Sequence, residues 1–220
     1  DMFNTTALED YKFSYVCGGG SYTSCNGVGV SADYTTKNGA LFNHIFGSFF
    51  GGYDVQNNFM RSSIATDKLG LVCIWSGRPK WITHGLAMGE SFADCYLKTQ
   101  NNFQDYDANF YQNSPHLGFM GDVSLRTNTV MPASNMALNA NGDSSSATVT
   151  WDASTETGIQ GYYVYRSHKP FGGYVLLNTT PTTSTSFVDN APYDGTNHYM
   201  VRTAKLTTTG SGSYVNLSLG

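Results

Sequence analysis

The sequence predicts two domains of different fold class: an α/β domain with a doubly wound, mostly parallel sheet over residues 1–132, and an all-β sandwich over residues 133–220. Three observations predict this division. Short apolar runs bounded by glycine, typical of buried parallel strands, occur in the first part. Helical patterns alternate with these runs, as in a doubly wound sheet. After Pro132 the hydrophobic period changes to two, in short strands separated by Gly, Pro and Asn, which is typical of a β-sandwich.

The α/β domain is organised around an apolar run that begins at Leu41 and ends in the small residues Gly47-Ser48. We expect a buried parallel strand here, and ligands of open α/β sheets gather beyond the carboxyl ends of such strands. Residues 11–17 have the pattern of a central strand, so we expect the first strands of the sheet to precede Asp1 in a longer precursor. The other elements expected are a helix over 57–65, a strand over 69–75, a helix over 82–97 and a short strand over 116–120.

The second domain resembles a fibronectin type III domain over roughly residues 134–220. The matching features are Trp151 on the second strand, the Tyr-x-Val-Tyr-Arg strand that ends at Arg166, and Tyr199, which is similar to the tyrosine-corner residue of that family. The resemblance implies a fold and not a function. The period-two strands expected after the linker 131–134 are 147–151, 161–166, 174–177, 185–189, 198–204 and 214–217.

The composition favours a secreted or cell-surface protein. Charged residues make up 13% of the chain, against about 25% in typical globular proteins, and Gly, Ser, Thr, Asn and Tyr take their place. The net charge of −4 gives no reason to expect nucleic acid or an anionic membrane as a partner. No apolar run approaches the ~18 residues of a membrane span. We therefore expect an extracellular location and a protein or glycan at the cell surface as the partner.

Four cysteines occur, at positions 17, 25, 73 and 95, and no pair has the C-x-x-C spacing of a structural zinc site. Cys17 and Cys25 flank one glycine-rich loop, which is flexible enough to bring them together, so we predict a Cys17–Cys25 disulfide in an oxidising compartment. The alternative is four buried free thiols, because Cys is often a small core hydrophobe.

The first domain resembles the C-terminal part of the caspase-like domain of gingipain-type cysteine peptidases, over roughly residues 11–132. The order of the signals carries the resemblance more than any single motif does. They are a strand that enters Cys17-Gly18-Gly19-Gly20-Ser21, a strand that ends at Gly47-Ser48 before Tyr53-Asp54, a strand that leads into Ser76-Gly77, and a closing segment Met120–Arg126 with Met131-Pro132 beyond it.

The resemblance implies a catalytic His after one strand and a nucleophilic Cys after the next. The His position falls at about Gly19, and the Cys position at about Ser48 or Phe49. Both catalytic residue types are therefore missing, and a glycine supplies neither a base nor a cation to activate a nucleophile. We predict a degenerate, non-catalytic peptidase-like domain that serves as a binding or structural module, with the fibronectin-like domain as a spacer or adhesive unit.

The alternative function is an active cysteine or serine peptidase with rearranged catalytic residues, for which the candidates are Cys17, Ser48 and His84. Cys17 lies at the end of the first strand and Ser48 at the end of the second. His44 lies four residues before Ser48 on the same strand, about 13 Å away, which is too far for a hydrogen bond. We interpret His44 as a histidine of the sheet.

A polar cluster beyond the strand 69–75 is the candidate ligand site. Arg78, Trp81 and His84 could bind an anionic or carbohydrate ligand there, whereas loop packing and helix capping are the ordinary alternative. The scattered aspartates have no calcium-loop spacing, so no cofactor is predicted, although the family resemblance leaves calcium open.

Overall fold

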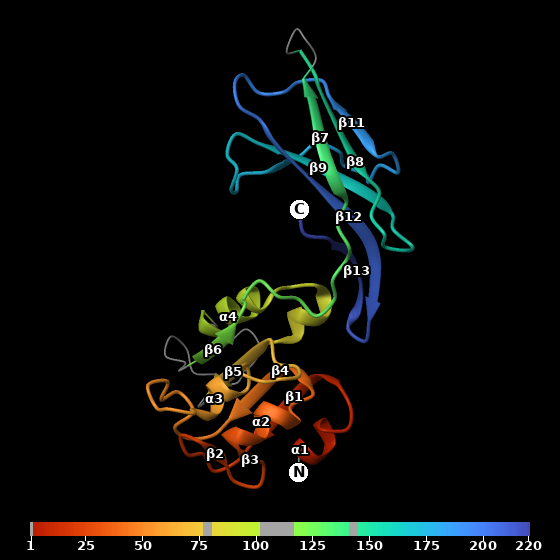
Figure 1. Cartoon of the computed structure of the whole chain (residues 1–220). Coiled ribbons are helices and arrows are strands. Elements are labelled where there is room, and N and C mark those ends of the chain that lie inside the picture. The colour runs from red at the N-terminus through yellow and green to blue at the C-terminus, as the bar shows by residue number, and fades with distance from the viewer. Residues whose placement is uncertain (1, 77–80, 102–116, 141–144) are drawn as a thin grey trace. The chain divides into compact units, whose positions relative to one another are not determined.

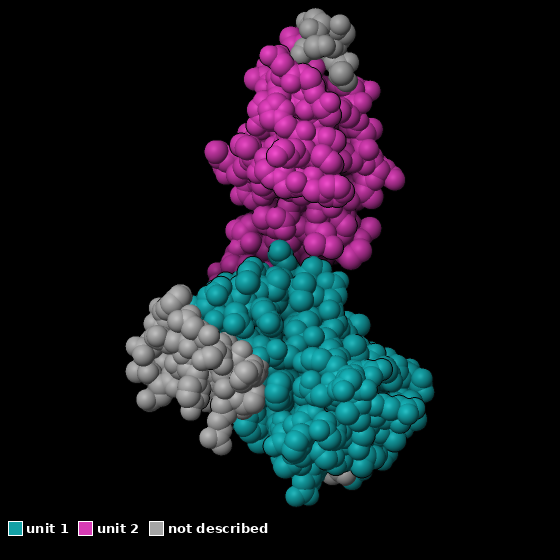
Figure 2. All heavy atoms as spheres, turned by 90° about the vertical axis from the view of Figure 1, so that its left-hand side faces the viewer, with its two compact units in different colours: residues 1–86, 90–127 teal, residues 87–89, 128–220 magenta. Residues whose placement is uncertain are grey.

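The computed structural model describes residues 2–76, 81–101, 117–140 and 145–220. By its contacts the chain divides into two compact units (Figure 2): unit 1 contains residues 1–86 and 90–127, and unit 2 contains residues 87–89 and 128–220. The domain boundary after residue 132 stays a prediction. None of the described helices is long and apolar enough to cross a membrane.

Unit 1 is built on a four-stranded sheet in the order β1-β4-β5-β6 (Figure 1). Strands β1, β4 and β5 are parallel, and β6 runs antiparallel to β5. The four strands confirm the runs expected from sequence, but the last one reverses direction. Their bounds are β1 Tyr11–Cys17, β4 Ala40–Phe46, β5 Val72–Ser76 and β6 Leu117–Gly121, and a small hairpin is formed by β2 Ser24–Cys25 and β3 Gly29–Val30.

The helices of unit 1 depart more from the expectation. The predicted helix over 57–65 is a single turn, and the one predicted over 82–97 is interrupted by Gly89, whose φ is +84°. Ser91 restarts the chain as a helix, because its hydroxyl accepts the Asp94 amide at 3.2 Å. Two short helices were not expected. The bounds are α1 Met2–Thr6, α2 Ser31–Lys37, α3 Phe59–Ser62, the 3₁₀ helix η1 His84–Met88 and α4 Phe92–Gln100.

The sheet of unit 1 separates two cores. On one face, helices α1 to α3 bury alternate strand residues such as Val16 and Ile45. On the other face, α4 and the segment before it cover Phe42 and Ile74. Side chains alternate across a strand, so each central strand serves both cores. Strand β1 differs, because the face of β1 that carries Phe13 and Tyr15 is exposed.

Unit 2 is a sandwich of two antiparallel sheets. One has the order β10-β9-β12-β13, and the other has the order β11-β8-β7. Trp151 and Tyr162 pack edge-to-face in the core between the sheets, with ring centroids 5.4 Å apart. Strand β7, which precedes the strand that carries Trp151, starts at Ser134, inside the predicted linker. The bounds are β7 Ser134–Ala140, β8 Ala147–Asp152, β9 Gly161–Ser167, β10 Val175–Leu176, β11 Ser186–Asp189, β12 His198–Thr209 and β13 Gly212–Leu217.

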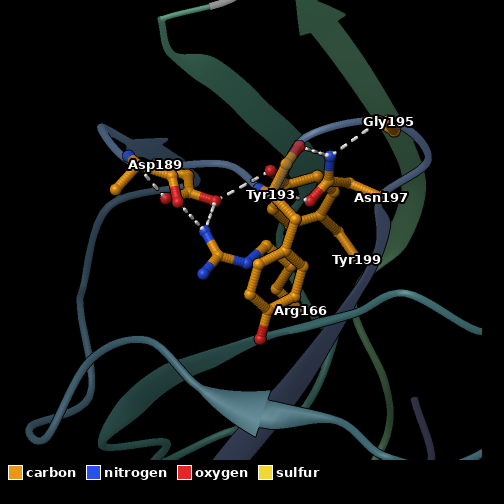
Figure 3. A network of polar contacts seen from close by, with 7 residues as sticks. Arg166, Asp189, Tyr193, Gly195, Asn197 and Tyr199 are labelled. Carbon is orange, nitrogen blue, oxygen red and sulfur yellow. Dashed lines mark hydrogen bonds and ion pairs between the residues drawn. The ribbon is translucent and has the colours of Figure 1, made fainter.

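A buried ion pair joins the two sheets of unit 2 (Figure 3). The Arg166 Nη1 group on β9 donates to Asp189 Oδ2 on β11 at 2.6 Å, and the Tyr199 hydroxyl on β12 donates to the same oxygen at 2.8 Å. The Tyr193 ring covers the guanidinium, with 3.9 Å from Arg166 Cζ to the ring centroid. Tyr199 thus bonds a side-chain carboxylate instead of the backbone acceptor of a tyrosine corner.

The two acids of this network titrate away from their ordinary values. Burial favours a raised pKa for Asp189, but the hydrogen bonds from Arg166 and Tyr199 outweigh burial and hold that pKa below its ordinary value. Burial, together with the hydrogen bond to Asp189, raises the pKa of Tyr199 to about 12. The carboxylate is therefore charged at neutral pH and bonded to both partners.

We predict that Asp189→Asn destabilises unit 2 by about 3–5 kcal/mol, because it leaves the Arg166 charge buried without its partner. Hydrogen exchange of the β9 and β12 amides, followed in the full chain, measures this loss. Because the folded pKa of Asp189 is depressed, the stabilisation is present above about pH 3.9 and is lost as the pH falls through the folded pKa.

Glu156→Gln is the matched control, because it removes the carboxylate of the more exposed ion pair with Lys205. Its effect should be much smaller, as is usual for surface pairs. Equal effects of the two changes would contradict a structural role for the cross-sheet pair.

Candidate functional site

The loops after β1 and β4 meet at the carboxyl end of the sheet, where chemistry is expected in an α/β fold. The Gly18 amide donates to Phe46 O at 3.1 Å, and the Trp75 indole donates to Gly47 O at 2.9 Å. A Cβ added at Gly20 would lie 2.2 Å from Ser48 O. The two loops therefore pack backbone against backbone, and glycine is required at their closest approach.

Cys17, the first candidate nucleophile, ends β1 with an exposed and free thiol. The predicted Cys17–Cys25 disulfide is wrong, because all four cysteines are free in the structure. Strand alternation gives the reason. Val16 points into the core that contains Cys25, so the next residue, Cys17, points to the opposite face of the sheet.

Ser48, the second candidate nucleophile, is exposed in the turn that follows β4. The next residue, Phe49, has a φ of 67°, a left-handed conformation that is uncommon for a bulky side chain. Its ring is 57% exposed and lies against the Tyr22 ring, with centroids 5.2 Å apart. The turn therefore presents an aromatic pair beside the serine hydroxyl.

His44 does not activate either nucleophile. His44 pairs in register with Tyr15, whereas Cys17 pairs with Phe46, and both of these residues lie two positions further along their strands. The His44 ring meets the Tyr15 ring edge-on at 5.1 Å. Burial lowers the pKa of His44 to about 4, so this imidazole is a weak base. Within the described residues, no hydrogen bond joins an imidazole to Cys17 or Ser48.

The predicted ligand cluster is not assembled as expected. Trp81 is only 6% exposed, and its indole donates to Trp75 O at 3.1 Å. Its ring packs against Tyr96 in the core under α4, so it offers no face to a ligand. His84 is exposed at the start of η1, and Arg78 lies outside the described residues.

An aromatic stripe on β1 was missed as a binding feature. We define it as Tyr11, Phe13 and Tyr15, which are 36%, 48% and 64% exposed on one face of β1. The alternation of these residues is visible in the sequence and predicted the strand. The sequence predicts β1 as a central strand, whose two faces would both be covered. Among the described residues β1 is instead the edge strand of the sheet, and α4 does not cover the face that carries the stripe.

Among the residues that the structure describes, no three His, Cys, Asp or Glu side chains are grouped so that they could hold a metal ion. Calcium binding stays an expectation from the family resemblance.

Comparisons with known proteins find similarity only to solved structures. No protein-family model and no curated protein matches the chain. Among solved structures, an Fn3-like protein from Clostridium thermocellum is 24% identical and covers 42% of this chain and 85% of its own, with a TM-score of 0.32. Rat CD45 domains d3–d4 are 19% identical and cover 44% of this chain and 53% of their own, with a TM-score of 0.29. The fibronectin type III resemblance of unit 2 rests on its own strand order, in which a four-stranded sheet faces a three-stranded one.

We predict that Gly20→Ala destabilises unit 1 by about 1–3 kcal/mol, because its Cβ would force the Ser48 backbone to move. Gly19→Ala is the matched control, since its Cβ would meet only Asn26 Cβ, at 3.8 Å. Urea unfolding followed by two-dimensional NMR, which resolves the two units, measures both. Equal midpoints for the two variants would contradict the close backbone packing of the loops.

We predict that unit 1 loses stability as the pH falls from about 6.5 to about 4. In this window the unfolded chain protonates His44 while the buried ring in the folded state stays neutral. The loss is at most about 3 kcal/mol and is reduced by the partial exposure of the ring. His44→Leu should flatten this part of the pH profile of the urea midpoint. His168→Leu, which changes a histidine of unit 2, is the control for the midpoint of unit 1.

Proposed function

We propose that this chain is part of a secreted or cell-surface bacterial protein in which unit 1 is a non-catalytic, caspase-like module of the gingipain type. Unit 1 binds a partner protein, and the fibronectin-like unit 2 is its spacer or adhesive domain. The sequence order of the strand-end motifs supports the gingipain-type assignment. The low charge content supports the extracellular location. The four cysteines are free and give this location no further support.

The arrangement at the strand ends supports a module without catalysis. A cysteine or serine nucleophile requires a base within hydrogen-bond reach. Cys17 and Ser48 each lack such a bond to an imidazole within the described residues, and the low pKa of His44 makes it a poor proton acceptor. The loop position that the family resemblance assigns to the catalytic His is occupied by Gly19.

The aromatic stripe on β1 is the observation that carries the binding function. Three aromatic residues on one exposed strand face form an apolar surface, and such surfaces mark interaction sites. Among the described residues, β1 pairs with β4 alone, so the main-chain groups on its other edge are paired with no strand of this chain. An extended polypeptide satisfies both features, because its backbone adds to the edge and its apolar side chains cover the stripe. A glycan would use only the aromatic faces.

Selection of displayed random peptides on the immobilised full chain tests this function. We expect peptides with alternating apolar residues, whose affinity falls at least tenfold for Phe13→Ser and for Tyr15→Ser. Both side chains are exposed, so the fold should tolerate these changes. Phe171→Ser, which removes a 91% exposed ring from unit 2, is the control and should leave the affinity unchanged.

Three results would overturn the proposal. Selected peptides that bind the stripe variants as well as the parent chain would remove β1 as the binding edge. Turnover of a peptide library, with covalent labelling of Cys17 or Ser48 that is lost in His84→Ala or His44→Ala, would establish the alternative, a peptidase with rearranged residues. Binding to a glycan array in place of peptides would replace the protein partner by a carbohydrate.

A further inference from the structure

A cleft of about 570 Å³ lies beside α3, away from the candidate catalytic residues, none of which lines it. We call it the α3 cleft. Arg61 on α3 and Tyr53 in the preceding loop form its polar side, and Ile64, Ala65 and Met120 form an aliphatic wall. Its volume is within the range of small-ligand sites.

Among the described residues that line the α3 cleft, Arg61 is the one with a charged side chain. Its Nη1 group donates to Tyr53 O at 3.1 Å and to Val55 O at 3.4 Å, which fixes the plane of the guanidinium. No carboxylate of the described residues forms an ion pair with Arg61, and the other N–H groups of the fork bond to none of those residues. An oriented guanidinium with open donors fits a carboxylate, which it can bind through two parallel hydrogen bonds.

A second hollow of about 450 Å³ continues the α3 cleft toward α2. The two share Asn57, just before α3, and Ser62, the last residue of α3, so they meet alongside this helical turn. The described residues on the α2 side of the lining have hydroxyl or small apolar side chains, including Ser31 and Thr35, and none of them is charged. Asn57 stands at the junction with a φ of 55°, a left-handed conformation that asparagine tolerates.

We propose that the α3 cleft binds the C-terminal end of an extended polypeptide. The terminal carboxylate pairs with Arg61, and an apolar last side chain packs on Ile64, Ala65 and Met120. The preceding residues follow the hydroxyl-lined hollow, whose side chains bond to a peptide backbone. The aliphatic wall favours a peptide over an acidic sugar, because sugar rings stack on aromatic faces and Tyr53 is the one aromatic residue among the described residues of this lining.

Fluorescence anisotropy with the full chain tests the proposal. The probe is a fluorescein-labelled peptide, Gly-Ser-Thr-Val-Leu, with a free C-terminal carboxylate, and its C-terminal amide is the paired probe. We expect saturable binding of the acid and at least tenfold weaker binding of the amide. Arg61→Gln should weaken binding of the acid at least tenfold. Lys68→Gln, which removes a nearby exposed cation outside the cleft, is the matched control and should change nothing.

A second variant covers the case in which Arg61→Gln loosens the loop that Arg61 anchors. Ala65→Trp places a large ring in the cleft from an exposed position and leaves Arg61 intact, so it should also abolish binding. Equal affinity for the acid and the amide, or unchanged binding by both variants, would overturn the proposal. Competition by sodium glucuronate as strong as that by the unlabelled peptide would overturn it in favour of a sugar acid. The stripe variants Phe13→Ser and Tyr15→Ser should leave this affinity unchanged, so the cleft and the β1 edge are tested separately.

Discussion

Strand β1 is buried on one face and open on the other, and the character of unit 1 depends on this asymmetry. Ser14 and Val16 are buried on the face covered by helices α1 to α3, while Phe13 and Tyr15 on the opposite face meet solvent. The helical layer on that second face is α4 with the segment before it, which covers the strands beyond β1. An edge strand that is anchored by a full core on one side can present a rigid apolar surface on the other, at little conformational cost to binding.

The strand ends show a second constraint. Backbone contact between the loops after β1 and β4 uses glycine at positions 20 and 47, where a Cβ would collide with the backbone of the opposite loop. These loops are held tightly without catalytic side chains between them. Among the described residues, His44 is the imidazole on the strand that leads to Ser48, and its burial beside Tyr15 favours the neutral form. Within the described residues, these loops therefore keep a closely packed strand-end arrangement in which no imidazole is hydrogen-bonded to Cys17 or Ser48.

In unit 2, the polar network has a different effect from the apolar core. Trp151 and its neighbours fill the space between the sheets and favour any sandwich of suitable volume. The Arg166–Asp189 pair connects one strand from each sheet, and Tyr199 bonds to the same carboxylate. Such a directional contact between the sheets penalises a shifted register, because a shift would leave a buried charge unpaired. The tyrosine predicted from the sequence was thus the right residue with a different acceptor.

The sequence by itself determined the strands, because hydrophobic period and glycine boundaries are local properties that survive in every context. It determined the four strands of the unit 1 sheet, the sandwich pattern of unit 2, and the absence of His and Cys at the positions that the family resemblance makes catalytic. Tertiary structure decided which face of each element is covered. Trp81 lies in the core instead of a ligand site. Cys17 lies on the face of the sheet opposite to the core that contains Cys25. Arg61 and Met120, which are 59 positions apart in the sequence, line the same cleft. These outcomes depend on contacts between residues distant in sequence, which no local pattern encodes.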